Sequence, residues 1–470
     1  MAGADASVEA AGRLAAPRRL GTFRLGALSL YWVALGYLWL PLGSQVLPIL
    51  ILHTVGDANK GKFTAILEGF GTFVAVFWQP VLGSLSDRTN SRFGRRKPYI
   101  VVGTIGSAVF LLLMALSGGY LWLLALYFLL QLSENAAQAP YQGLLPDVVP
   151  VEERSRASAF VGAGNLLGLA LGFAVVGTFM GMGRPELALA SMALVLLVAM
   201  AVVVLGFPDT VKPPPSDHKP LFRVVIDTFR ISPTEHRDFI WLMVSRLCIL
   251  LSIAGLQRYA VFYFKDVFFP GKGTHLEQLA SIAGRDLQVV VVLFALLASF
   301  PAGELSHRVG RKPLIVASGV LGALGTVGMM LSPYGILPAA VLAPVAGLFS
   351  VPTQLAQTLY FAVLLGIATG MFLSVDWAFL VDVIPHEESG RFLGFSNIAT
   401  AGSGVLAGFI GGFLIDIFNA RGHILGQPGG YPVTFGVYVV FFGLGTLAIF
   451  KVRETRGRGG QVPAAIPMGH

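Results

Sequence analysis

The chain has 470 residues, of which 55% are hydrophobic and 12% are charged, whereas charged residues make up about 25% of an average soluble domain. This composition excludes a soluble enzyme. The net charge of +8 would suit a nucleic-acid partner, but the basic residues lie in short runs between apolar stretches, which is typical of membrane orientation signals. The single cysteine, Cys248, excludes an intrachain disulfide and a cysteine-based metal site.

Long apolar stretches recur through the whole chain, and several exceed the roughly 18 residues that indicate a membrane span. They predict an all-α polytopic membrane protein that is not an enzyme, because no catalytic motif accompanies the spans. We also expect no metal site and no cofactor. The twelve predicted transmembrane helices cover residues 25–52, 63–84, 98–118, 121–145, 157–180, 186–206, 238–264, 285–304, 313–332, 358–383, 392–418 and 431–451.

The distribution of Lys and Arg between the spans predicts the orientation of the chain. Most of the 33 basic residues fall on the side of the membrane that holds both termini, and loops rich in Lys and Arg face the cytoplasm. We therefore expect a multi-pass protein of the plasma (cell inner) membrane with both termini cytoplasmic. The predicted order is an N-terminal tail (1–24), a six-helix bundle (25–206), a Pro-rich linker (207–237), a second six-helix bundle (238–451) and a C-terminal tail (452–470).

Two sequence motifs occur once in each half of the chain. The segment 83–98 (GSLSDRTNSRFGRRKP) has a shorter copy at 303–313 (GELSHRVGRKP), and the segment 147–153 (DVVPVEE) is repeated at 382–388 (DVIPHEE). Two repeats in the same order indicate an internal duplication. The longer spacing in the second half locates an insertion over 333–357. We interpret it as an outer hairpin or interfacial segment, because one extra span would reverse the orientation of the second motif.

The first motif resembles the signature loop of the major facilitator superfamily, and the second copy fits the two six-helix halves of that fold. The resemblance implies a conformational latch on the cytoplasmic side, although a solvated basic loop that only sets the topology is the alternative. His307 replaces the acidic residue in the second copy, so we expect that latch to be weaker or pH-sensitive. The implied latch residues are Gly83, Asp87, Arg88, Gly94, Arg95 and Arg96 in the first half and His307, Arg308 and Arg311 in the second.

Three stretches of the first half narrow the resemblance. The loop 86–98, the helix-4 segment 132–147 and the helix-5 segment 164–168 are similar to those of glycoside–pentoside–hexuronide cation symporters and of proton-coupled sucrose transporters. Those sucrose transporters carry an acidic residue at the position aligned with Gln131, whereas this chain has Glu134 one turn later, on a neighbouring face of the helix. The resemblance implies a proton- or cation-coupled sugar symporter.

Ionisable residues inside membrane spans cost about 2.5–3.5 kcal/mol on insertion scales, and those present commonly line a cavity, form pairs or move protons. Five stand out in this chain: Glu68, Glu134, Arg246, Arg258 and Asp376. At a rise of about 1.5 Å per residue, Glu134 lies near the bilayer midplane on helix 4. The superfamily resemblance implies that this helix lines the central path. We select Glu134 as the proton acceptor; the alternative is a protonated carboxyl group that only joins helices.

The other four charges form two predicted pairs. Arg246 and Asp376 lie at a similar depth on helices 7 and 10, so we predict an ion pair that is either static or opens during transport. Glu68 and Arg258 fall near the outer ends of helices 2 and 7, which makes them candidates for an outer gate. Snorkelling of both side chains to the membrane interface is the alternative.

Polar side chains at steps of three and four follow helix 4, which is unfavourable unless they border a wet cavity. Carboxamides beside aromatic rings suit the hydroxyls and C–H faces of a sugar. Each aromatic side chain taken alone is more often a packing or interfacial-belt residue than a sugar-binding one. The predicted solute-binding residues are Gln131, Asn135, Gln138 and Gln142 on helix 4, with Asn165, Tyr37, Trp39 and Trp377.

These features predict a secondary active transporter that moves a sugar or glycoside by symport with alternating access. The predicted coupling ion is H⁺, with Na⁺ as the alternative. We expect a monomer whose partners are a small-molecule substrate and the lipid bilayer, without nucleic acid. The alternatives are an exporter or antiporter of another small molecule, and a non-transporting sensor or pigment- or lipid-handling scaffold of the same fold.

Overall fold

The computed structural model describes residues 21–150, 153–207, 209, 236–384 and 389–453. Eleven helices in this part of the chain are long and apolar enough to cross a membrane. Helix α6 (Tyr120–Val148), with 29 residues, is also long enough, but its polar residues lower its hydropathy. The predicted all-α architecture is confirmed. Most of the two predicted tails and of the linker, and residues 385–388 of the repeated motif, lie outside the described residues.

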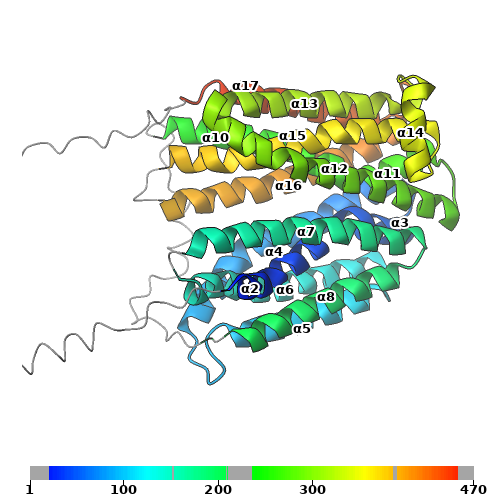
Figure 1. Cartoon of the computed structure of the whole chain (residues 1–470). Coiled ribbons are helices and arrows are strands. Elements are labelled where there is room, and N and C mark those ends of the chain that lie inside the picture. Colours follow the sequence, from blue (N-terminus) through cyan, green and yellow to red (C-terminus); the bar gives the residue numbers. More distant parts are fainter. Residues whose placement is uncertain (1–20, 151–152, 208, 210–235, 385–388, 454–470) are drawn as a thin grey trace, which may run out of the picture. The chain divides into compact units, whose positions relative to one another are not determined.

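The helices form two compact units, which Figure 1 shows. Unit 1 comprises Met1–Val46 and Phe70–His218, and unit 2 comprises Leu47–Gly69 and Lys219–His470. The segment Leu47–Gly69, which contains the end of predicted helix 1 and the start of predicted helix 2, therefore packs with the helices of the second half. Ion pairs and a close backbone contact hold this segment in unit 2.

Unit 1 consists of helices that pack in pairs through their apolar faces. Its largest pairings join α2 to α7 and α5 to α6, and α8 packs on both α2 and α5. Helix α4 begins in unit 2 and enters unit 1 at Phe70. The elements are α2 (Thr22–Pro41), η1 (Leu42–Val46), α4 (Lys60–Arg88), α5 (Lys97–Met114), α6 (Tyr120–Val148), α7 (Arg154–Gly181) and α8 (Pro185–Gly206).

One apolar core runs through unit 2, and Leu52 of the segment Leu47–Gly69 belongs to it. Helix α15 packs against α12 and α13, while α10 packs against α16 and α17. The elements are α3 (Leu47–Val55), η2 (Asp57–Asn59), α10 (Arg237–Arg258), α11 (Ala260–Tyr263), η4 (Phe264–Phe268), α12 (Thr274–Val309), α13 (Arg311–Leu331), η5 (Ser332–Tyr334), α14 (Ala339–Phe349), α15 (Thr353–Val383), α16 (Ser389–Arg421), β1 (His423–Ile424), β2 (Gln427–Pro428) and α17 (Gly430–Ile449).

Predicted helix 1 is interrupted by a π-helical turn, and predicted helix 7 is interrupted at Tyr259 and ends in a second π-helical turn. The turn η1 separates α2 from α3, and the turn η4 follows α10 and the short helix α11. Such turns are rare and are frequent at functional sites. Hydropathy predicted two continuous helices because it does not register a change in the hydrogen-bond pattern of the backbone.

The predicted insertion at 333–357 contains the short helix α14, which runs across the ends of α13 and α15 (Figure 1). Its 11 residues span about 16 Å at the helical rise, about half of a hydrocarbon core of roughly 30 Å. Helix α14 is therefore too short for a span. The Tyr360 hydroxyl of α15 donates to the Val341 carbonyl oxygen over 2.5 Å and ties the insertion to unit 2.

Candidate functional site

Glu134 of α6 is fully buried in unit 1 and is held by a chain of hydroxyl groups. The Tyr31 hydroxyl of α2 donates to Glu134 Oε1 over 3.1 Å and lies 2.7 Å from Thr104 Oγ1 of α5. Glu134 Oε2 has no hydrogen-bond partner among the described residues, and no described basic side chain pairs with this carboxyl group. A buried carboxylate without a counter-charge is costly, so the surroundings favour a carboxyl group that carries a proton.

The remaining polar residues of α6 differ in how they are engaged. Gln131 Nε2 donates to the Tyr127 hydroxyl over 3.0 Å, and Asn135 Nδ2 donates to the Gln131 carbonyl oxygen over 2.8 Å. Both amides are buried, so their hydrogen bonds are directed within unit 1. Gln138 and Gln142 are half-buried. They are therefore more accessible to a solute than Gln131 and Asn135.

The predicted aromatic residues of the solute-binding set differ in how exposed they are. Tyr37 is buried, and its hydroxyl donates to Ser191 Oγ of α8 over 3.0 Å, which directs it toward a neighbouring helix. Trp39 and Asn165 are half-buried in unit 1. Trp377, on α15 of unit 2, is 49% exposed. Trp377 therefore has the largest free aromatic surface in the predicted solute-binding set.

The predicted latch of the first half is a network of ion pairs within unit 1. Arg95 and Arg96 both pair with Asp147 at the end of α6, over 2.8 and 2.6 Å. Asp87 at the end of α4 lies 3.0 Å from Arg96 and 4.0 Å from Arg95. Asp147 thus binds the two arginines more closely than Asp87 does. The sequence showed Asp147 as part of a repeated motif, but it did not show that Asp147 pairs with Arg95 and Arg96. Arg88 is exposed.

Gly94 allows this loop to turn back onto Asp209. Its φ is +97°, and a Cβ atom there would lie 2.3 Å from the Asp209 carboxylate, so only glycine fits. Asp209 Oδ2 accepts from the backbone N–H groups of Arg96 and Lys97 over 2.6 and 3.0 Å. The carboxylate caps the start of α5. Gly83 lies on α4, half-buried, ahead of this loop.

The second copy of the motif preserves one of these pairs. Arg311 Nε lies 2.6 Å from Asp382 Oδ2, and these two residues occupy the motif positions of Arg95 and Asp147. His307 is exposed. Arg308 pairs with Glu304 one turn earlier over 2.7 Å. An exposed pair of that kind contributes little to stability, and the pH sensitivity expected at His307 stays a prediction.

Arg246 joins three helices of unit 2. It forms an ion pair with Asp376 of α15, and Arg246 Nε donates to Thr400 Oγ1 of α16 over 3.2 Å. The guanidinium carbon lies 6.0 Å from the centre of the Trp377 ring. Asp376 Oδ1 is buried without a hydrogen-bond partner among the described residues. The structure thus brings together the two charges for which the sequence predicts a pair.

Glu68 and Arg258 are also brought together, inside unit 2. The Arg258 guanidinium pairs with the Glu68 carboxylate of α4 and donates to the Gly404 carbonyl oxygen of α16. The two side chains are 15% and 8% exposed. Breaking a buried pair by removing one partner costs about 3–5 kcal/mol. This contact therefore holds the segment Leu47–Gly69 against the rest of unit 2.

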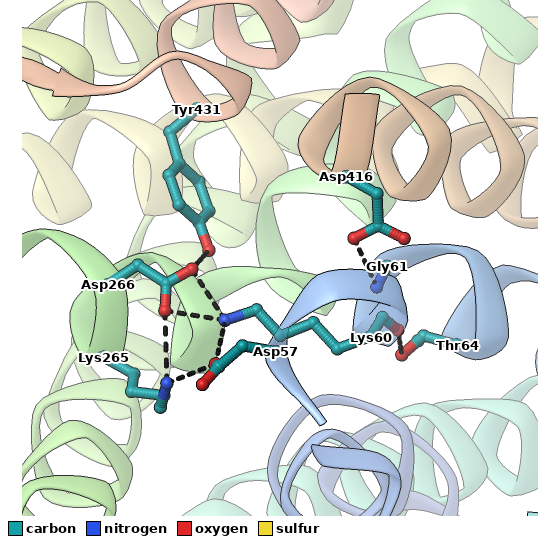
Figure 2. Close-up of polar contacts among 8 residues, drawn as sticks. All are labelled: Asp57, Lys60, Gly61, Thr64, Lys265, Asp266, Asp416 and Tyr431. Carbon is teal, nitrogen blue, oxygen red and sulfur yellow. Dashed lines mark hydrogen bonds and ion pairs between the residues drawn. The ribbon is translucent and has the colours of Figure 1, made fainter. Parts of the chain in front are cut away.

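A second group of charges, which the sequence did not single out, holds the same segment (Figure 2). Lys60 Nζ lies 2.6 and 2.7 Å from the two Asp266 carboxylate oxygens and 3.1 Å from Asp57 Oδ1. Lys265 Nζ lies 2.5 Å from the same Asp57 oxygen, and the Tyr431 hydroxyl donates to Asp266 Oδ2 over 2.5 Å. We call Asp57, Lys60, Lys265 and Asp266 the Lys–Asp cluster. Its charges sum to zero, which offsets the burial of Lys60, 1% exposed.

Lys265 of the Lys–Asp cluster keeps its charge near neutral pH. Burial disfavours the charged form of Lys265, but the hydrogen bond to Asp57 and the charge of Asp266 outweigh it and raise the pKa of Lys265. Stability from a raised lysine pKa is fully present below the unfolded value and is lost only as the pH rises through the folded value. Lys265 is therefore not a switch near neutral pH.

Asp416 of α16 caps the first turn of α4, next to the Lys–Asp cluster (Figure 2). Its carboxylate accepts from the backbone N–H of Gly61 over 3.0 Å and of Lys62 over 2.7 Å. The unpaired N–H groups at a helix N-terminus favour negative charge. Gly61 also packs directly on Gly412, because a Cβ atom at Gly61 would lie 2.3 Å from the Gly412 carbonyl oxygen. Any larger side chain at Gly61 would separate α4 from α16.

The described residues include no cluster of three or more His, Cys, Asp or Glu side chains that could hold a metal ion.

Comparison with known proteins identifies the chain's relatives. The family model of the Major Facilitator Superfamily matches residues 33–356 and 279–465. The chain is 27% identical over 186 residues to the general alpha-glucoside permease of Schizosaccharomyces pombe, which covers 34% of this chain and 33% of that protein. It is 26% identical over 147 residues to the sucrose transport protein SUC3 of Arabidopsis thaliana, which covers 26% and 24%.

Other relatives have different names. The chain is 31% identical over 127 residues to the class H tetracycline resistance protein of Pasteurella multocida, which covers 27% of this chain and 30% of that protein. The crystal structure of the D323A mutant of the nucleoside transporter NupG matches with a TM-score of 0.66 and 14% identity, over 92% of this chain and 99% of that one. The chain thus matches a third or less of each curated relative named here, while the structural likeness extends over its whole fold.

We expect Lys60→Met to lower the stability of the purified protein, because it leaves the Asp266 carboxylate facing Lys265 alone at 3.5 Å. The expected loss is about 3 kcal/mol, measured by thermal unfolding in detergent. Lys272→Met, at an exposed position, is the matched control and should have little effect. The double variant Lys60→Met/Asp266→Asn should recover part of the loss. Equal melting temperatures for Lys60→Met and Lys272→Met would contradict this account of the Lys–Asp cluster.

Proposed function

Because the chain belongs to the major facilitator superfamily, whose members here are transporters and not enzymes, we propose that it transports a sugar or glycoside by proton-coupled symport. The multi-pass membrane fold and action on a small-molecule substrate follow from the family. Sugar, proton coupling and a plasma-membrane location with cytoplasmic termini are our proposal. The observation that carries it is the buried, uncompensated carboxyl group of Glu134.

The hydroxyl chain beside Glu134 suits a group that gains and loses a proton. When Glu134 is charged, Tyr31 can donate to it while Thr104 donates to Tyr31. When Glu134 is protonated, it can donate to Tyr31, and Tyr31 to Thr104, because hydroxyl groups both donate and accept. The 3.1 and 2.7 Å distances fit either direction. Both protonation states therefore keep their hydrogen bonds without movement of a helix, which is what a reversible proton carrier requires.

The sugar part of the proposal rests on named relatives and on suitable residues. The alpha-glucoside permease and the sucrose transport protein match this chain, and the half-buried carboxamides of Gln138 and Gln142 can bind hydroxyl groups. The specific observation for the second candidate, a drug exporter, is the 31% identity to the tetracycline resistance protein. We place it second because Glu134 and the carboxamides give α6 a polar character that suits a hydroxyl-rich solute.

We further propose that the Lys–Asp cluster and the Glu68–Arg258 pair form a gate on the side of the membrane opposite the termini. Both hold the segment Leu47–Gly69 against the rest of unit 2. Charges can exchange their protein partners for water once such a gate opens, which keeps the energetic cost of opening moderate. The π-turn η1 ends at Val46, next to this segment, and supplies a place for helix 1 to bend.

The coupling proposal is tested with sealed proteoliposomes that contain a pH-sensitive dye. Addition of the transported sugar without Na⁺ should acidify the interior, and the panel should include sucrose, maltose, glucose and xylose. Glu134→Gln should abolish acidification but retain exchange of labelled sugar, because the neutral amide fixes the protonated form. Ser133→Ala, at a half-buried position of the same helix, serves as the control and should acidify the interior as the wild-type protein does. No acidification by any sugar, or wild-type acidification in Glu134→Gln, would refute the proposal.

The gate is tested by cross-linking. In a Cys248→Ser background, Asp57→Cys and Lys265→Cys place two thiols where the native side chains are in hydrogen-bond contact. A short thiol-specific bifunctional reagent should stop sugar exchange, and a reductant should restore it. Each single-cysteine variant, treated in the same way, is the control. Full exchange activity with the cross-link in place would show that these residues stay together throughout the cycle and are not a gate.

A further inference from the structure

Unit 2 contains a small cavity beside the interruption of predicted helix 7. Helix α10 ends at Arg258 and α11 begins at Ala260, and the cavity is lined by residues on both sides of this break, including Gln257, Ala260 and Tyr263. Interrupted helices within membrane proteins commonly mark binding sites, since irregular backbone is tolerated only where it is covered by protein or borders a cavity. The position alone makes this cavity a candidate for binding.

Gln288 of α12 supplies the cavity with an acceptor that lacks a donor. The side chain is 1% exposed and lines the cavity. Its Nε2 donates to the Gln257 carbonyl oxygen, at the break, over 3.1 Å, which fixes the orientation of the amide. Gln288 Oε1 has no hydrogen-bond partner among the described residues. A buried acceptor without a donor is costly, so the site is built for a group with an O–H or N–H.

Two hydroxyl groups of the cavity wall are already committed as donors. Thr369 Oγ1 donates to the Leu365 carbonyl oxygen over 2.7 Å, and the Tyr263 hydroxyl donates to the Met329 carbonyl oxygen over 2.6 Å. Both can therefore only accept. A group that bonds to either hydroxyl oxygen therefore has to be a donor, and no charged side chain lines the cavity. These features favour a neutral hydroxyl group and exclude an ionic one.

The size of the cavity limits the group further. Its volume of about 30 Å³ is room for about two water-sized groups, and most of the lining side chains are apolar. A sugar ring is too large. A hydroxymethyl group fits, because its CH₂ contacts the apolar wall while its O–H donates to Gln288 Oε1. A water molecule is the alternative occupant, because it can also donate to Gln288 Oε1.

We propose that this cavity receives the hydroxymethyl group of a hexose unit of the solute, and that Gln288 is the residue that recognises it. The inference rests on the proposed sugar transport and adds a selectivity rule to it. A hexose carries the exocyclic hydroxymethyl group, whereas the corresponding pentose lacks it. The protein should therefore prefer hexose units over pentose units.

The cavity is also connected to the Lys–Asp cluster. The Tyr263 ring, in the cavity wall, lies 5.5 Å from the Tyr431 ring, and the Tyr431 hydroxyl donates to Asp266 (Figure 2). Two side chains, Tyr263 and Tyr431, thus connect the cavity to Asp266 of the proposed gate. This places the recognition of the hydroxymethyl group where a bound solute can bias the gate.

The test compares D-glucose with D-xylose, which differ only by the hydroxymethyl group, as competitors of the sugar that acidifies proteoliposomes. The wild-type protein should bind glucose about tenfold more tightly than xylose, the value of one well-made hydrogen bond. Gln288→Met keeps the volume but removes the amide. It should weaken the binding of glucose about tenfold and leave the binding of xylose unchanged, so that the preference for glucose disappears.

Two further variants keep the test decisive. Gln357→Met makes the same change at another buried position of unit 2, where both amide groups are bonded, to Leu337 N and the Ser332 carbonyl oxygen, and should leave the preference intact. Ala260→Val fills the cavity without removing a polar group and should weaken the binding of glucose but not of xylose. This variant replaces Gln288→Met in the test if Gln288→Met does not fold.

The outcomes separate the two proposals. A wild-type protein that transports sugar without a preference for glucose over xylose, or a preference unchanged in Gln288→Met and Ala260→Val, would overturn the assignment of the cavity and leave sugar transport standing. It would mean that the cavity holds water only. Absence of sugar flux in the wild-type protein would refute the proposed function, and this inference with it.

Discussion

A charge that is moved from water into the space between apolar helices needs a partner within the protein. In unit 2 three pairs of charges meet this requirement: Arg246 with Asp376, Arg258 with Glu68, and Lys60 with Asp266. Each of these contacts joins different helices. The pairing of buried charges therefore decides which helix segments stay together, and it explains why Leu47–Gly69 belongs to unit 2 although the chain continues from it into unit 1 on both sides.

Glu134 is the exception that gives this arrangement a function. It is buried as deeply as the paired charges, but hydroxyl groups surround it where the others have a cation. A carboxyl group without a cation can satisfy the same constraint by taking up a proton. The paired charges satisfy it through each other. The ion pairs thus hold helices together. The carboxyl group of Glu134 can carry a proton in the proposed mechanism.

Much of the fold could be predicted from the sequence because membrane spans must be long and apolar. The helices follow from that requirement, whereas the duplication and the short insertion at 333–357 follow from the two repeated motifs and their spacing. The start of α12 at Thr274, before the predicted 285, could not be predicted, because its first turns carry polar and charged residues such as His275 and Glu277. The π-turns η1 and η4 were also missed, since a change in backbone register leaves hydropathy unaltered.

The candidate site was predictable only where a residue is unusual in its own helix. Intramembrane charges such as Arg246 and Asp376 stand out for that reason, and the structure brings them together. The Lys–Asp cluster was not found, because Lys60 and Lys265 lie in predicted loops, where charges are ordinary. Gln288 was missed because its importance comes from a partner, the Gln257 carbonyl oxygen at a helix break. Tyr37 was selected by residue type, and only packing showed that it faces Ser191.

In the proposed mechanism, Glu134 exchanges a proton while its surroundings stay in place. Infrared difference spectroscopy of the protein in lipid, recorded across a pH titration, tests this directly, because a protonated carboxyl group has its own C=O band. The account predicts one band that titrates within the pH range in which transport runs and that is missing in Glu134→Gln. A spectrum in which Glu134→Gln and the wild-type protein are identical at every pH would contradict it.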